Sequence, residues 1–70
     1  MITAKVICST KIEQGEDVRV TFGPDYADGR NKEWASKTPA LSLTMTVKPD
    51  VADRFNPGDK FTLTFEPADD

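Results

Sequence analysis

The chain has 70 residues, of which 37% are apolar and 30% charged, and this predicts one small folded domain with a thin core. The formal net charge of −3 argues against broad electrostatic binding to nucleic acid or to an anionic membrane, so we expect neither partner. A single cysteine excludes an internal disulfide, and the lack of histidine removes the commonest catalytic dyads and zinc sites. We also expect no membrane span and no signal peptide, because no apolar run approaches about 18 residues.

Alternating apolar and polar residues predict four β-strands, at residues 2–9, 17–22, 41–47 and 60–66. β-branched and aromatic side chains dominate all four segments, as strands prefer. Ile12 can extend the first strand toward the next turn. Gly15 supplies the positive φ that a tight turn needs, so we predict a hairpin between the first two strands.

The segment between the last two strands predicts a short helix. Pro49 suits the first helical position, and Asp50 suits the positive N-terminal end. Val51 and Phe55 lie four residues apart and would place one apolar stripe against the sheet. The Asn-Pro-Gly sequence at residues 56–58 then ends the helix and turns the chain.

Together these elements predict a mainly β protein: a small antiparallel sheet of four to five strands, or a half-open barrel, with one short helix between the last two strands. We expect a single domain over residues 1–66 and an acidic tail at residues 67–70. The residues that alternation turns inward are Ala4, Val6, Cys8, Val18, Val20, Phe22, Leu41, Leu43, Met45, Val47, Phe61, Leu63 and Phe65. So thin a core favours a homo-oligomer or a protein docked on a larger partner.

The residue types do not predict a catalytic or metal site. Cys8 falls in the inward register, where a thiol behaves as a small hydrophobe with a raised pKa, and there is no histidine to activate it. The acidic segment 25–33 fails the spacing of a calcium loop, because Ala27 and Gly29 stand at its third and fifth positions. We therefore expect no enzymatic activity, no metal and no cofactor.

The long connection at residues 23–40 holds the only tryptophan and the only tyrosine, so a binding site is most expected there. The candidate binding residues of this loop are Tyr26, Arg30, Lys32, Trp34 and Lys37. Cations beside an aromatic ring can stack a base or hold a phosphate, but acidic residues in the same stretch cancel much of that field. The plainer alternative is that Trp34 tucks the loop onto the barrel edge.

Threonines dominate the outward positions of the last two predicted strands. The candidate interface residues on this face are Thr44, Thr46, Thr62 and Thr64. A solvated sheet face usually carries more lysine and glutamate, so this face reflects either plain β propensity or a flat surface for packing against another protein. The last strand has no proline or bulge signal inside it, and at a sheet edge it could add to a neighbouring sheet.

From the long loop onward, the order of features resembles that of small, mostly uncharacterised proteins of tailed bacteriophages. These share an asparagine and aromatic pair, a Thr-Pro step, an alternating strand, a short helix, and a Pro-Gly turn into a final strand ending in Phe-x-Pro. The matching features here are Lys5, Asn31, Trp34, Thr38, Pro39, residues 41–47, Pro49, Phe55, Pro57, Gly58, Phe61, Phe65 and Pro67. Ala40 and Lys48 stand where the relatives often carry a small polar residue and an asparagine.

The resemblance implies a phage or prophage origin and a non-enzymatic protein that acts by packing against other proteins. The role it favours is a virion-associated component, of the head decoration or cement kind, bound to the capsid or to copies of itself. The alternative is an inhibitor of a host or anti-phage defence protein, or a binder that sequesters a signalling nucleotide, through the loop at residues 23–40. The expected location is the virion or the host cytoplasm.

Overall fold

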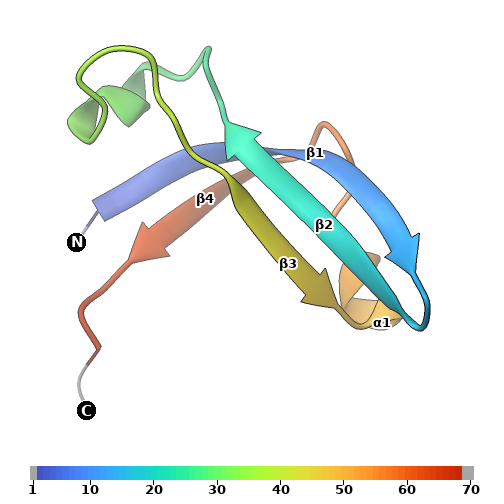
Figure 1. The fold of residues 1–70 in the computed structure, drawn as a ribbon. Helices are drawn as coiled ribbons and strands as arrows, with labels where there is room; N and C mark the ends of the chain where they lie inside the picture. The colour runs from blue at the N-terminus through green and yellow to red at the C-terminus, as the bar shows by residue number, and fades with distance from the viewer. Residues whose placement is uncertain (1, 69–70) are drawn as a thin grey trace.

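The computed structural model describes residues 2–68 and shows one antiparallel sheet in the strand order β3-β2-β1-β4 (Figure 1). The elements in chain order are β1 (Ile2–Gln14), β2 (Asp17–Pro24), the 3-10 helix η1 (Gly29–Glu33), β3 (Leu43–Val47), α1 (Pro49–Ala52) and β4 (Lys60–Phe65). The sheet curls into a half-barrel, and α1 lies between β3 and β4 in the chain. This confirms the mainly β prediction with one short helix before the last strand.

The β1–β2 hairpin has the predicted glycine turn but a longer first strand. Gln14 pairs with Asp17, so the turn has two residues, and Gly15 adopts a φ of +65° there. The first strand runs to Gln14 rather than ending near residue 9, because β2 pairs with it all the way to the turn. The register shifts between Cys8 and Thr10, and this bulge turns Ile12 to the outer face, where it is 44% exposed.

Strand β3 begins at Leu43, two residues later than the alternation predicts. The ladder between β2 and β3 runs from the Val18–Val47 pair to the Phe22–Leu43 pair. The next partner for Leu41 would be Pro24, which has no backbone N–H to donate. The strand therefore starts at Leu43, where the hydrogen-bonded ladder with β2 begins.

The core lies on the concave face of the sheet and is covered from one end. Its buried apolar residues are Ala4, Val6, Cys8, Val18, Val20, Phe22 and Ala52. The predicted inward residues of the two outer strands are only half-buried, and these are Leu41, Leu43, Met45, Val47, Phe61 and Leu63. Phe65 was predicted to be inward but is 54% exposed, because it pairs with Ile2 at the end of the sheet that no second layer covers.

Helix α1 and the residues after it form this partial cover. The helix ends at Ala52, shorter than the predicted 49–55, and Ala52 rather than Val51 is its buried residue. Phe55 packs edge-on against Phe22 and Phe61, with ring centroids 5.4 and 5.3 Å apart. Of the predicted acidic tail, residues 67–68 are exposed and residues 69–70 lie outside the described part of the chain.

Candidate functional site

The long loop is held to the sheet by one buried side-chain amide. Asn31, on η1, is 1% exposed, and its Oδ1 accepts hydrogen bonds from the backbone N–H of Lys5 at 2.7 Å and from Trp34 Nε1 at 3.1 Å. Its Nδ2 donates to the carbonyl oxygens of Lys5 at 2.9 Å and of Asp25 at 3.2 Å. Because two partners can only donate and two can only accept, the orientation of the amide is fixed. The side chain thus takes the place of a peptide group beside β1, where β2 has ended.

Trp34 packs against the core and binds Asn31, so it is part of the contact that holds the loop to the sheet. Its ring is half-buried and packs against the hydrophobic core cluster, while its Nε1–H is bound to Asn31. Trp34 therefore fits the alternative in which it holds the loop onto the barrel edge.

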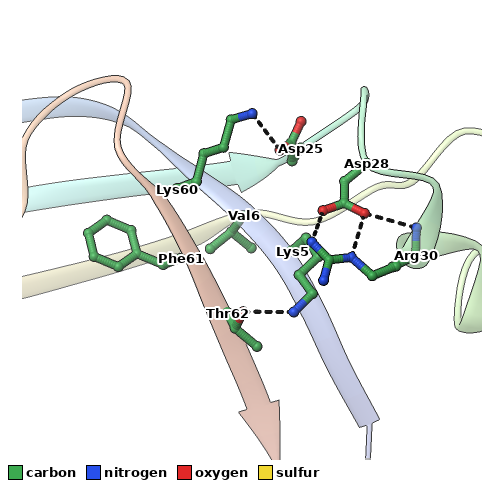
Figure 2. A pocket seen from close by; sticks show the side chains of 8 residues that line it. All are labelled: Lys5, Val6, Asp25, Asp28, Arg30, Lys60, Phe61 and Thr62. Atoms are coloured by element: carbon green, nitrogen blue, oxygen red, sulfur yellow. Dashed lines mark hydrogen bonds and ion pairs between the residues drawn. The ribbon is translucent and has the colours of Figure 1, made fainter.

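Arg30 lines a small polar pocket and is paired there with Asp28 (Figure 2). Its Nε and Nη2 donate to the two carboxylate oxygens of Asp28 at 3.0 and 2.7 Å. These hydrogen bonds lower the pKa of Asp28 to about 2 and raise the pKa of the Arg30 guanidinium. Lys5 Nζ donates to Thr62 Oγ1 at 2.8 Å, and Lys60 Nζ lies 3.7 Å from Asp25 Oδ2. The pocket, about 130 Å³ in volume, is therefore lined by two cation–carboxylate pairs and by the hydrogen bond between Lys5 and Thr62.

The remaining candidate residues of the loop do come together. Tyr26, Lys32 and Lys37 line one hollow of about 520 Å³ on the loop, together with Thr38, Pro39 and the Asp28 that is paired with Arg30. Tyr26 is 68% exposed there. An exposed aromatic ring beside two lysines is suited to an anionic ligand that carries a flat group.

A second hollow lies on the concave face of the sheet and is apolar. It is lined by residues of all four strands and of the segment after α1, namely Val6, Phe22, Leu43, Met45, Phe55, Phe61, Thr62 and Leu63. Its volume of about 230 Å³ is below the range of about 300–1,000 Å³ typical of small-molecule sites and suits one or two protein side chains. The alternating sequence placed the β3 and β4 residues of this hollow inward, but alternation does not report that they are only half-buried.

The predicted threonine interface is one face of the sheet but not one cluster. Thr44 and Thr46 lie on β3, whereas Thr62 and Thr64 lie on β4, at the opposite edge of the strand order. All four are exposed, and Thr62 is hydrogen-bonded to Lys5. The two threonine pairs therefore belong to two separate sheet edges.

Cys8 is buried, as its register predicts. Burial raises the pKa of the Cys8 thiol, and the nearby Asp59 carboxylate raises it further, while Lys11 acts in the opposite direction. Across residues 2–68, no three metal-ligating side chains of the histidine, cysteine or acidic kind gather into a group. No helix in that range is long and apolar enough to cross a membrane.

Comparison with known proteins identifies no matching family, no matching curated protein and no matching solved structure.

Proposed function

We propose that this protein is a non-enzymatic module that works by packing against other protein chains. The observation that carries the proposal is the half-covered concave face. Its apolar groove between β3 and β4 has the size of a protein side chain rather than of a cofactor. Domains normally bury such a face under a second layer, and here α1 and Phe55 supply part of one.

The sheet edges support the same role. β3 and β4 are the two outer strands, and their free edges carry unpaired backbone groups. Between Leu43 and Val47 there is no charge, no proline and no bulge to block a further strand. Exposed edges beside an uncovered apolar face are the features by which sheets extend into a partner.

The phage resemblance makes the virion the first place to look for this partner. The test is quantitative mass spectrometry of purified particles from the genome that encodes the chain, with a major capsid protein as the copy-number reference. We expect many copies per particle. If the protein is expressed in infected cells but absent from particles, the virion role is wrong.

A second candidate role follows from the loop hollow lined by Tyr26, Lys32 and Lys37. In this role the protein binds an anionic host ligand, such as a signalling nucleotide, during infection. Titration with a nucleoside monophosphate, followed by amide chemical shifts, tests it. Binding should move the resonances of residues 26–39 and should be lost in Lys32→Ala/Lys37→Ala. Shifts confined to other regions, or none at millimolar ligand, would count against the loop.

A further inference from the structure

Strand β4 is an outer strand, and for each of its residues it can be worked out whether the backbone N–H and C=O groups point toward β1 or toward the free edge. On β1, Cys8 accepts from Gly58 N–H and donates to Asp59 O, so its backbone groups point toward β4. Ala4 and Val6 share this direction, because alternate residues of a strand point to the same side. Their partners Leu63 and Phe61 therefore point their backbone groups at β1.

The remaining residues of β4 point the other way. The N–H and C=O groups of Lys60, Thr62 and Thr64 face away from β1, and no strand formed by residues 2–68 lies on that side. Pro67 falls in the set that faces β1, so its missing N–H costs the free edge nothing. This edge can accept a further antiparallel strand along its whole length.

The sequence of β4 and the residue after it is complementary to itself. It reads Lys60, Phe61, Thr62, Leu63, Thr64, Phe65, Glu66, and is symmetric about Leu63 apart from the opposite charges at its two ends. In an antiparallel pair of identical strands centred on Leu63, each Lys60 faces Glu66 of the second copy. Each Phe61 then faces Phe65 of the second copy, and each Thr62 faces Thr64. Aromatic, threonine and opposite-charge pairs are the cross-strand pairs that stabilise sheets.

The directions of the backbone N–H and C=O groups fit this register. The Thr62–Thr64 pairs would be hydrogen-bonded, because both residues point to the free edge. The Leu63–Leu63 and Phe61–Phe65 pairs would be non-hydrogen-bonded, which is the pair type with the closest side chains. These apolar pairs lie on the concave side, so the second copy covers Phe65, which is 54% exposed in the single chain.

The exposed area of the chain exceeds that of an average compact monomer by about the area of one interface. A compact monomer of 7.7 kDa exposes about 4,300 Å². This chain exposes 5214 Å², about 900 Å² more. A stable interface buries about 800 Å² on each partner, which is close to the excess.

Strand β3 is the competing edge, and its pattern is weaker. A symmetric pair centred on Met45 would place Leu43 opposite Val47, but Lys48 would face Ser42 rather than an acidic residue. Pro49 follows directly and ends the strand pattern. The charge complementarity that selects one register is present only in β4.

We propose that two copies of this chain pair through antiparallel β4 strands, related by a twofold axis at Leu63, to form one continuous sheet. The proposal rests on the packing function above and names its first partner as a second copy.

The first test is sedimentation equilibrium on a matched pair of proline variants. Thr64→Pro removes an N–H from the free edge of β4, and Thr46→Pro removes the corresponding N–H from the free edge of β3. On β2, the Asp25 N–H points at β1, so Val20 points at β3. Its partner Met45 therefore points at β2, and Thr46 points outward. Neither N–H is used inside the monomer, and edge strands tolerate such a proline. We expect twice the 7.7 kDa mass for the wild type and for Thr46→Pro, and a dissociation constant at least about tenfold higher for Thr64→Pro. Far-UV circular dichroism checks that both variants remain folded.

The second test does not depend on a proline being tolerated. In a Cys8→Ala background, Leu63→Cys places two thiols at the twofold axis, where a non-hydrogen-bonded pair has about the Cα separation of a disulfide. Mild oxidation should link Leu63→Cys into dimers rapidly, whereas Met45→Cys, the equivalent centre of β3, should stay largely monomeric.

Several results would overturn the pairing. A wild type that stays monomeric at millimolar concentration, dimers that survive Thr64→Pro, or preferential linking through Met45→Cys each contradict it. A monomer in solution that is nevertheless abundant in particles would reject the β4 pair while leaving the packing function intact. A β4 dimer that is absent from particles would support the β4 pair and reject the virion role.

Discussion

Replacing the side-chain amide of Asn31 should lower the stability of the fold more than most single substitutions in the chain. Asn31→Ala removes the acceptor of the Lys5 N–H and of Trp34 Nε1. The carbonyl oxygens of Lys5 and Asp25 lose the Asn31 donor but keep their bonds from the N–H groups of Asp25 and Asp28. An unsatisfied buried polar group costs about 1–3 kcal/mol, and water can reach part of this network once the loop loosens. We therefore expect a loss of about 3 kcal/mol in the free energy of unfolding. A domain of 70 residues has only about 4–10 kcal/mol in total.

Urea unfolding measures this loss, and amide hydrogen exchange locates it. The Lys5 amide should be protected in the wild type and exchange rapidly in the variant, because Asn31 Oδ1 is its acceptor. Asn56→Ala is the matched control: Asn56 is exposed in the turn after α1, and its replacement should change stability by less than about 0.5 kcal/mol. A loss below about 1 kcal/mol for Asn31→Ala, or a Lys5 amide that stays protected, would refute the reasoning.

A nearly isosteric variant separates hydrogen bonding from packing. Asn31→Asp keeps the size of the side chain but turns a carboxylate oxygen toward the carbonyl oxygens of Lys5 and Asp25, where Nδ2 now donates. Burial without a cationic partner raises the pKa of such a carboxyl group. We expect this variant to be less stable than Asn31→Ala at pH 7 and to recover part of the difference as the pH falls.

Three further predictions concern the loop, the hairpin and the core. In an NMR titration the pKa of the Asp28 carboxyl should be about 2, and it should move toward 3.8 in Arg30→Gln. The stability from this pair is therefore complete above pH 3.8 and disappears as the pH falls through about 2. A pKa that is unchanged in Arg30→Gln contradicts the pairing. Gly15→Ala should cost about 1 kcal/mol in thermal unfolding, because its φ is +65°, whereas Gly23→Ala should be nearly silent; equal effects would show that φ is not the cause. Phe55→Ala should cost about 2–3 kcal/mol in urea unfolding, since it removes two edge-on aromatic contacts, and a cost below about 1 kcal/mol would mean that Phe55 adds little cover.

The sequence by itself determined the local elements of this protein. Side chains alternate across a strand, so the patterns at residues 17–22, 41–47 and 60–66 placed three strands within two residues of their observed bounds. Gly15 determined the hairpin because few other residues tolerate its φ, and Pro49 determined where α1 begins. These features depend on neighbours along the chain, which a sequence displays directly.

Tertiary structure alone decided how the elements are covered and joined. Asn31 is an anchor only because its amide meets Lys5, 26 positions away, and no local pattern encodes that meeting. The same alternation buried Val20 completely and left Phe65 more than half exposed. The difference is that Val20 lies on the inner strand β2, which α1 contacts, and Phe65 lies on the outer strand β4. Burial depends on what packs over a face, and alternation reports only which face a residue occupies.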